Sequence, residues 1–159
     1  MKKPVLAVTL GDAAGTGPEL IVKAFGEPEV RGVCRPVVVG SAEVMRAAVR
    51  IVGAKSEVRV IGKAAEAGDD AGVVEVIDLA NVDVAKLERG KVSAATGRAA
   101  YEAIKRAVEL TLAGETSAVV TSAINKAALH AAGCHYDGHT ELLAELCGKP
   151  KVTMMLVAG

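Results

Sequence analysis

The stretch Pro36-Val37-Val38-Val39-Gly40 decides the fold class, because its three central residues are all apolar and β-branched. A strand with one wet face alternates apolar and polar residues, whereas a strand covered on both faces is apolar throughout. A helical pattern over residues 42–52 follows almost at once. We therefore expect a buried strand that leads directly into a helix, as in the parallel sheets of α/β proteins.

The same alternation of short apolar runs and longer alanine-rich stretches extends along the chain. Strands are predicted over residues 5–10, 36–40, 58–61, 73–79, 118–121 and 152–157. Helices are predicted over residues 18–25, 42–52, 94–112, 126–132 and 140–146. Residues 62–72 are predicted to be a surface loop. The whole pattern indicates an α/β fold with helices packed on a mostly parallel sheet.

Composition and charge exclude several classes of protein. The 159 residues carry 19 Lys and Arg against 19 Asp and Glu, so the formal net charge is zero. Nucleic acids and anionic membranes attract an excess of positive charge, so neither is an expected partner. The apolar start is too short for a signal peptide, and no apolar run is long enough for a membrane span. The three cysteines form no Cys-x-x-Cys pair, and we expect a soluble, reduced, cytoplasmic protein.

The first stretch of interest follows the first predicted strand and reads Gly11-Asp12-Ala13-Ala14-Gly15-Thr16-Gly17-Pro18-Glu19. Pro18 suits the first turn of a helix, and free N–H groups at such a turn can hold an anion. The glycine spacing fits neither a dinucleotide-binding fingerprint nor a P-loop, and Asp12 and Glu19 would repel an anion. A structural turn and a loop that lines a site both remain open.

The second stretch begins the longest predicted helix and reads Gly90-Lys91-Val92-Ser93-Ala94-Ala95-Thr96-Gly97-Arg98. Ser93 suits the N-cap position, and Gly97 allows another element to approach very closely. Arg98 has two possible roles, because it can reach a ligand or pair with Glu102 one turn later.

The third stretch, Thr121-Ser122-Ala123-Ile124-Asn125-Lys126, follows a predicted buried strand. Open α/β sheets bind their ligands at the carboxyl ends of the strands, so these polar residues are candidates for a site. A side chain that caps the next helix explains part of the pattern but leaves Lys126 unexplained.

The fourth stretch reads Gly133-Cys134-His135-Tyr136-Asp137-Gly138-His139-Thr140-Glu141. The turn signal at 137–138 separates the two histidines, which argues against a metal site on one helix. His139 and Thr140 at the start of a helix would instead form an anion-binding corner, with a capping Thr140 and an exposed His139 as the structural alternative.

Taken in this order, the motifs resemble those of the 4-hydroxythreonine-4-phosphate dehydrogenases. The matching residues are Gly11-Asp12-x-Ala14-Gly15-x-Gly17-Pro18-Glu19, Gly90-Lys91-x-Ser93-x3-Gly97, Ile124-Asn125-Lys126 and Gly138-His139-Thr140-Glu141. The resemblance covers the whole chain, including residues 152–157. Because members of that family are about twice as long, the chain resembles only their first half.

The resemblance implies the fold of isocitrate and isopropylmalate dehydrogenases, in which two α/β domains flank a cleft and the enzyme is a homodimer. Residues 1–125 would then form the N-terminal portion of the first domain, and residues 126–159 would start the second. It also implies oxidation of 4-phosphohydroxy-L-threonine by NAD, followed by decarboxylation, in pyridoxal phosphate (vitamin B6) synthesis. A divalent metal, zinc or else magnesium or cobalt, would favour the alkoxide of the substrate.

Carried over to this sequence, the resemblance assigns substrate binding to His139 and Thr140. Asp12, Asn125 and Lys126 would border the cleft. The metal-binding histidines of the family and the main part of its NAD site lie beyond Gly159. We therefore expect no metal ligand within this chain, assign no residue to NAD, and expect the 159 residues alone to be inactive.

The sequence departs from the family pattern at Ala13 and Ala123, where proline is usual, and at Thr16, where an apolar residue is usual. These departures bear on the substrate more than on the fold. The alternatives are a dehydrogenase of D-threonate or D-erythronate 4-phosphate, a dehydrogenase of an aromatic cis-diol, and a non-enzymatic α/β binding module.

Overall fold

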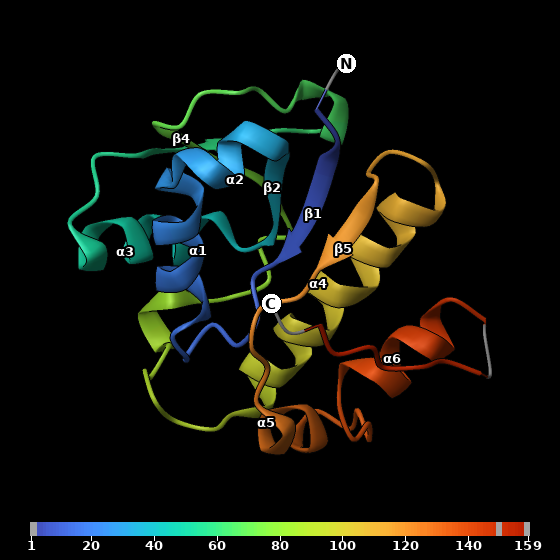
Figure 1. The fold of residues 1–159 in the computed structure, drawn as a ribbon. Coiled ribbons are helices and arrows are strands. Elements are labelled where there is room, and N and C mark those ends of the chain that lie inside the picture. Colours follow the sequence, from blue (N-terminus) through green and yellow to red (C-terminus); the bar gives the residue numbers. More distant parts are fainter. Residues whose placement is uncertain (1–2, 149–150, 158–159) are drawn as a thin grey trace.

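The protein, seen here in a computed structural model that describes residues 3–148 and 151–157, is built around a five-stranded sheet (Figure 1). The strand order is β3-β4-β2-β1-β5. The strands are β1 (Val5–Thr9), β2 (Arg35–Gly40), β3 (Glu57–Val60), β4 (Val73–Asp78) and β5 (Ala118–Val120). All described strand pairs are parallel, which confirms the predicted fold class.

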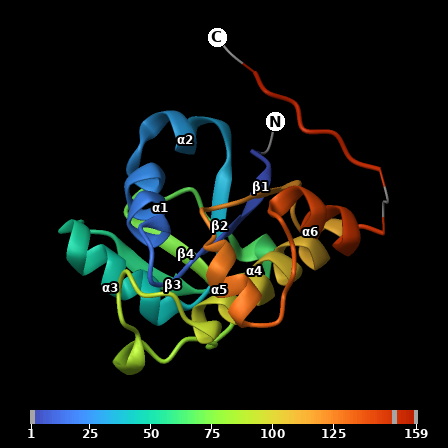
Figure 2. The same cartoon turned by 90° about the horizontal axis from the view of Figure 1, so that it is seen from below.

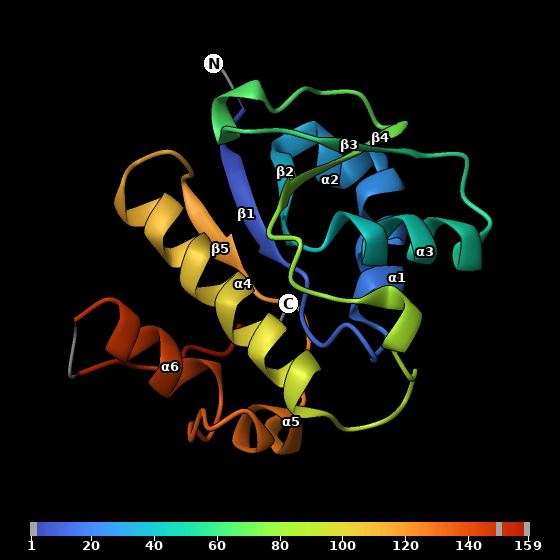
Figure 3. The same cartoon turned by 180° about the vertical axis from the view of Figure 1, so that it is seen from behind.

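Helices cover both faces of this sheet. The α-helices are α1 (Gly17–Gly26), α2 (Pro28–Val33), α3 (Ala42–Val52), α4 (Ala94–Leu112), α5 (Lys126–Ala131) and α6 (His139–Leu146). Two short 3-10 turns, η1 (Ala64–Glu66) and η2 (Val84–Lys86), complete the fold. The helices α1 and α3 pack on one face, and α4 packs on the other, where Figure 3 shows it in front of β1 and β5.

The apolar run in β2 is explained by these two layers. Val38 belongs to the core beneath α1 and α3, whereas Val37 and Val39 belong to the core beneath α4. All three side chains are fully buried. The prediction that β2 is covered on both faces is therefore confirmed, and its sequence could not alternate without placing a polar group in one of the cores.

The contact between α4 and α5 depends on Gly97. A Cβ atom at this position would lie 1.9 Å from the carbonyl oxygen of Ala128, so the two helix backbones touch. Ser93 caps α4 as predicted, because its hydroxyl accepts a hydrogen bond from the Thr96 N–H at 3.1 Å. Arg98 does not pair with Glu102; it donates instead to the Ala132 carbonyl at 3.4 Å.

Three segments differ from the sequence-based predictions. Residues 62–72 are more than a surface loop, because η1 and the residue after it bury Ala64 and Ala67 against the α4 side of the sheet. The helix α2 was not predicted, since its sequence Pro-Glu-Val-Arg-Gly-Val is too short for an apolar period to show.

The predicted strand 152–157 is wrong in this structure. Residues 151–157 form exposed, irregular chain that Figure 2 shows running clear of the sheet. A strand needs a neighbour for its N–H and C=O groups, and no backbone hydrogen bond joins this segment to another described residue. Although the segment is rich in β-branched and apolar residues, it has no neighbouring strand among the described residues with which to pair.

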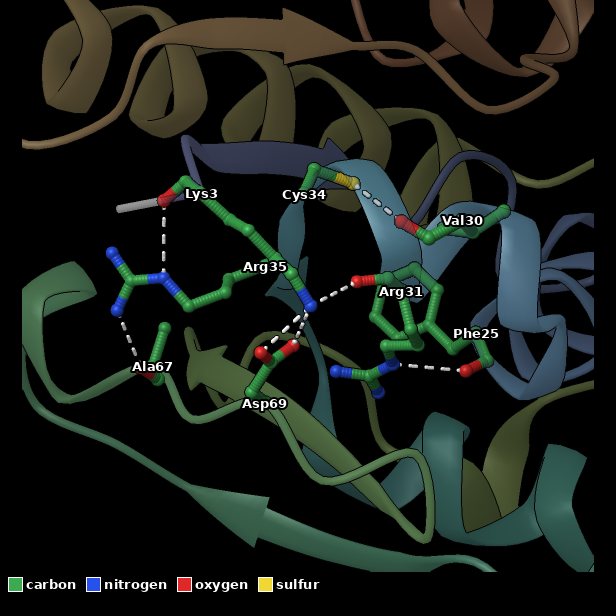
Figure 4. A network of polar contacts seen from close by, with 8 residues as sticks. All are labelled: Lys3, Phe25, Val30, Arg31, Cys34, Arg35, Ala67 and Asp69. Atoms are coloured by element: carbon green, nitrogen blue, oxygen red, sulfur yellow. Dashed lines mark hydrogen bonds and ion pairs between the residues drawn. The ribbon is translucent and has the colours of Figure 1, made fainter. Parts of the chain in front are cut away.

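The amino edge of the sheet is held by a network of cationic side chains (Figure 4). Arg31 is only 5% exposed and donates to the carbonyl oxygens of Phe25, at 2.9 Å, and Val73, at 2.6 Å. Lys3 donates to the Arg31 carbonyl at 2.7 Å and pairs with Asp69. The network ties the start of the chain to α2 and to the segment before β4, at the edge opposite the candidate site described next.

Candidate functional site

The carboxyl ends of β1 and β5 are joined directly. The Ser122 N–H donates to Oγ1 of Thr9 at 3.1 Å, and the Asp12 N–H donates to the Ala123 carbonyl at 2.9 Å. Two stretches far apart in the sequence therefore meet where an open α/β sheet places its ligands. The family resemblance implied that both border the cleft, but neither it nor the residue pattern predicted the contact through Ser122.

Two glycines make this contact possible. Gly11 has a φ of 76°, and a Cβ atom there would lie 2.5 Å from the Ala123 carbonyl oxygen. At Gly17, a Cβ atom would lie 2.6 Å from Oγ of Ser122. Their spacing is therefore fixed by close packing against residues 122–123 rather than by the geometry of a dinucleotide-binding turn.

The first part of the glycine-rich loop uses its N–H groups within the protein. Oδ1 of Asp12 accepts from the Ala14 N–H at 3.0 Å, and the Asp12 carbonyl accepts from the Gly15 N–H at 3.0 Å. The Ala14 carbonyl in turn accepts from Gly90 at 2.8 Å. These bonds favour the structural turn over a phosphate cradle for this part of the loop, with the buried Asp12 carboxylate as the residue that shapes it.

Asn125 caps α5, and Lys126 begins it. Oδ1 of Asn125 accepts from the Ala128 N–H at 3.1 Å, which accounts for the amide in this motif. Lys126 is exposed and takes part in none of the ion pairs found among residues 3–148 and 151–157. Its ammonium therefore remains available to a ligand at the carboxyl edge.

Removing the cap at residue 125 tests the first of these roles. We expect Asn125→Ala to lower the free energy of unfolding by about 1 kcal/mol, because the first turn of α5 loses its acceptor. Asn125→Asp keeps an oxygen in the same place and is expected to retain most of the stability. Urea unfolding followed by circular dichroism compares the two variants, and equal stability of both would contradict the capping role.

His139 and Thr140 form a different kind of corner at the start of α6. No side chain caps this helix, because Gly138 occupies the N-cap position in an extended conformation, and Thr140 lies inside the first turn. The structural alternative of a capping Thr140 is therefore wrong. Nε2 of His139 is buried and has no hydrogen-bond partner among the described residues. An uncapped helix start beside a hydroxyl and an unsatisfied imidazole nitrogen suits an anionic or hydroxylated ligand.

Burial lowers the pKa of His139 below its ordinary value of 6.5, because the imidazolium loses water. The unfolded chain then binds the proton more readily than the folded chain. The preference for a neutral ring stabilises the fold fully above pH 6.5 and is lost as the pH falls toward the lowered pKa. At neutral pH the ring is uncharged, so Nε2 can either donate or accept.

The pH dependence of stability checks this environment. We expect the wild-type chain to lose more stability than His139→Gln when the pH is lowered from about 7.5 to about 5.5, since glutamine does not titrate there. Urea unfolding at the two pH values gives the comparison. His135→Gln is the control, because His135 is exposed on the preceding loop. An equal pH dependence for wild type and His139→Gln would show that the ring is not desolvated.

The predicted site residues thus fall into two groups. Asp12, Asn125 and Lys126 lie on two segments that are hydrogen-bonded to each other through residues 9, 12, 122 and 123. His139 and Thr140 lie on α6, and no hydrogen bond or ion pair described here joins them to the first group. Within the described ranges, no three His, Cys, Asp or Glu side chains come close enough to hold a metal ion.

The fold and site define a parallel α/β protein whose polar loops gather at the carboxyl edge of its sheet. The sequence model of the family described as "Pyridoxal phosphate biosynthetic protein PdxA" matches residues 32–159. The chain belongs to this PdxA family. No helix in the described part of the chain is long and apolar enough to cross a membrane.

Individual relatives agree with this assignment. The chain is 42% identical to a 4-hydroxythreonine-4-phosphate dehydrogenase of Trichlorobacter lovleyi over 155 residues, 97% of this chain and 46% of the relative. It is 45% identical to a D-threonate 4-phosphate dehydrogenase of Cupriavidus necator, over 98% of this chain and 46% of the relative. A crystal structure of a 4-hydroxythreonine-4-phosphate dehydrogenase from Burkholderia phymatum matches with a TM-score of 0.94 and 46% identity, over 99% of this chain and 48% of that one. The chain spans about half the length of the curated relatives it matches.

Proposed function

We propose that this chain is the N-terminal part of an NAD-dependent and divalent-metal-dependent dehydrogenase of a phosphorylated hydroxy acid, with 4-phosphohydroxy-L-threonine as substrate. Decarboxylation of the oxidised product would follow, in pyridoxal phosphate synthesis. The observation that carries the proposal is the match of nearly the whole chain to the Burkholderia phymatum enzyme. A homodimer in the cytoplasm, with residues 126–159 starting a second domain, belongs to the same proposal.

In this proposal, His139 and Thr140 bind the substrate. The neutral imidazole offers a buried Nε2 without a partner, and the uncapped first turn of α6 offers N–H groups to an anionic substrate oxygen. The exposed Lys126 adds positive charge at the carboxyl edge of the sheet. All three features favour a small, negatively charged, hydroxylated molecule.

When bound, NAD would supply the hydride acceptor, and the metal would supply a Lewis acid for the substrate hydroxyl. The side chains described here do not provide a metal site, because no suitable cluster of three ligands occurs among them. Following the family resemblance, the proposal places the metal ligands, and the main part of the NAD site, in residues that family members carry beyond the position of Gly159. On that ground we also propose that the 159-residue chain alone does not turn over substrate.

D-threonate 4-phosphate is the second candidate substrate. The chain is 45% identical to the Cupriavidus necator D-threonate 4-phosphate dehydrogenase and 42% identical to the Trichlorobacter lovleyi 4-hydroxythreonine-4-phosphate dehydrogenase. The two substrates carry an amino group and a hydroxyl group, respectively, at the same carbon. These sequence identities cover only about half of each relative and do not distinguish between the two substrates.

NADH formation by the longest protein that the gene encodes tests the proposal. The two substrates are assayed in parallel, with and without added zinc. Turnover of 4-phosphohydroxy-L-threonine alone supports the first proposal, and turnover of D-threonate 4-phosphate alone supports the second. If neither reacts, D-erythronate 4-phosphate and aromatic cis-diols are assayed next, and no turnover of any of them would favour a non-enzymatic binding module.

Truncation of His139 tests the substrate-binding corner. We expect His139→Ala to lower kcat/KM roughly 100-fold, because a hydrogen bond to a charged substrate group is lost in a partly buried site. His135→Ala, which removes an exposed imidazole four residues earlier, is expected to leave kcat/KM unchanged. Steady-state kinetics on both variants gives the comparison. If His139→Ala kept the same kcat/KM as His135→Ala, His139 would not be a substrate-binding residue.

A further inference from the structure

The start of α6, where His139 lies, is not fixed by side-chain hydrogen bonds. No side chain caps this helix, and Nε2 of His139 has no partner among the described residues. The preceding residues 132–138 form an irregular loop that follows α5. The position of the imidazole therefore depends on how the residues on either side of it pack.

One face of α4 holds α6, which lies beside it (Figure 3). Tyr101, Ile104 and Val108 are spaced by three and then four residues, so their side chains share that face of α4. Leu142 of α6 is fully buried in a cluster with Ile104 and Val108. This contact fixes α6 three residues after His139, on the downstream side only.

Tyr136 supplies the contact on the upstream side. Its ring lies nearly parallel to that of Tyr101, with 6.4 Å between the ring centroids and 10° between the planes. Aromatic rings whose centroids are about 4.5–7 Å apart attract each other when they are offset. The Tyr136 carbonyl also accepts from Nε2 of His130 at 3.2 Å. Tyr136 is therefore joined to both α4 and α5, three residues before His139.

The other described side-chain contact of this loop lies farther from His139 along the chain. Arg98 donates to the Ala132 carbonyl at the start of the loop, in an exposed hydrogen bond of 3.4 Å. A polar hollow of about 530 Å³ lies beside the two tyrosines. Burial, and after it the Glu145 carboxylate of α6, raise the pKa of Tyr136 above its ordinary value of 10. The phenol is therefore neutral at physiological pH, and the two rings stack as an uncharged pair.

We propose that Tyr101 and Tyr136 are positioning residues, whose stacked rings hold the His139 imidazole where it meets the substrate. This role rests on the proposed substrate binding by His139. The tyrosines act through the imidazole and need no contact with the substrate themselves. A displacement of about 1 Å in a group that orients a substrate changes the kinetics strongly, so loss of the stack is expected to be measurable.

Steady-state kinetics on the complete product of the gene test the positioning role. We expect Tyr136→Leu and Tyr101→Leu each to raise the KM of the phosphorylated substrate about 10-fold, while kcat and the KM of NAD change less than about two-fold. Tyr136→Phe keeps the ring and is expected to behave as the wild type. An unchanged substrate KM in both leucine variants would overturn the proposal.

Val44→Ala is the control for a general loss of stability. Val44 is fully buried in the core beneath α1 and α3, on the other face of the sheet. Its truncation is expected to destabilise the fold and to leave the substrate KM unchanged. If Val44→Ala raised the KM as much as Tyr136→Leu does, the effect would be one of stability, and the positioning role would be wrong.

A double-mutant cycle identifies the residue through which the stack acts. In a His139→Ala background, Tyr136→Leu is expected to change the substrate KM less than about two-fold, because the group that it positions is gone. An undiminished effect in that background would show that Tyr136 acts by another route and would overturn the proposal.

Titration of the imidazole itself separates this role from the proposed function. The carbon-13 resonance of His139 is identified by its absence in His139→Gln and is followed without substrate. Burial holds the pKa of His139 below 6.5, so Tyr136→Leu is expected to raise the pKa toward 6.5 and Tyr136→Phe to leave it unchanged. An unchanged pKa in Tyr136→Leu would overturn the positioning role, whichever substrate reacts. If the pKa rose but the wild type turned over no substrate, the proposed function alone would be wrong.

Discussion

Replacing Gly97 with alanine is expected to lower the free energy of unfolding by about 3 kcal/mol. In an isolated helix the same change would stabilise by about 1 kcal/mol, because alanine is the better helix former. Here the new methyl group would lie 1.9 Å from the Ala128 carbonyl oxygen and 2.7 Å from the Leu129 nitrogen. Both contacts are with backbone, which cannot rotate away, so α5 must move as a unit.

Gly32→Ala provides the matched control for this variant. Gly32 also lies in a helix, and a Cβ atom there would meet nothing within 4 Å. We expect Gly32→Ala to be neutral or stabilising by up to about 1 kcal/mol. Urea unfolding of both variants separates helix propensity from helix contact. If Gly97→Ala were as stable as the wild type, the close approach of α4 and α5 would be wrong.

Replacing Gly11 with alanine is also expected to lower the free energy of unfolding by about 3 kcal/mol. The left-handed backbone, with a φ of 76°, disfavours any side chain. The added Cβ atom would also lie 2.5 Å from the Ala123 carbonyl oxygen, which is the acceptor for the Asp12 N–H. The substitution should therefore open the junction between the first glycine-rich loop and residues 122–123.

Gly53→Ala isolates the conformational part of this effect. Gly53 ends α3 with a φ of 70°, and nothing lies within 4 Å of the position of its Cβ atom. We expect Gly53→Ala to lower the free energy of unfolding by only about 1 kcal/mol. Thermal and urea unfolding of Gly11→Ala and Gly53→Ala are compared. The additional loss of unfolding free energy in Gly11→Ala is the contribution of the contact with residue 123. Equal losses would mean that the junction contributes nothing beyond backbone strain.

The local features of this fold could be predicted because each is determined by a short sequence pattern. The apolar run of β2, the cap at Ser93 and the small residue at Gly97 each predicted the structure that is observed. These signals depend on neighbours in the chain or on the size of one residue. They also placed Asp12 after the buried strand β1 and Asn125 after β5, although β5 is largely exposed and the prediction that it is buried is wrong.

Features that depend on distant partners could not be predicted in the same way. Ser122 has no local signal, because its role comes from Thr9 and Gly17 at the other end of the sequence. The segment 152–157 has the composition of a strand, yet strand formation requires a neighbour that these residues do not find here. The unsatisfied Nε2 of His139 likewise reflects three-dimensional burial rather than sequence.

The hydrogen bond from Ser122 to Thr9 spans 113 residues of the chain, and this separation has a consequence for folding. Contacts between such distant residues form late, because a long loop must close first. During synthesis, β1 and β2 can pair early, whereas the other edge of β1 waits for β5 to leave the ribosome. The loop that carries Asp12 therefore acquires its final shape only after about three quarters of this chain has been made.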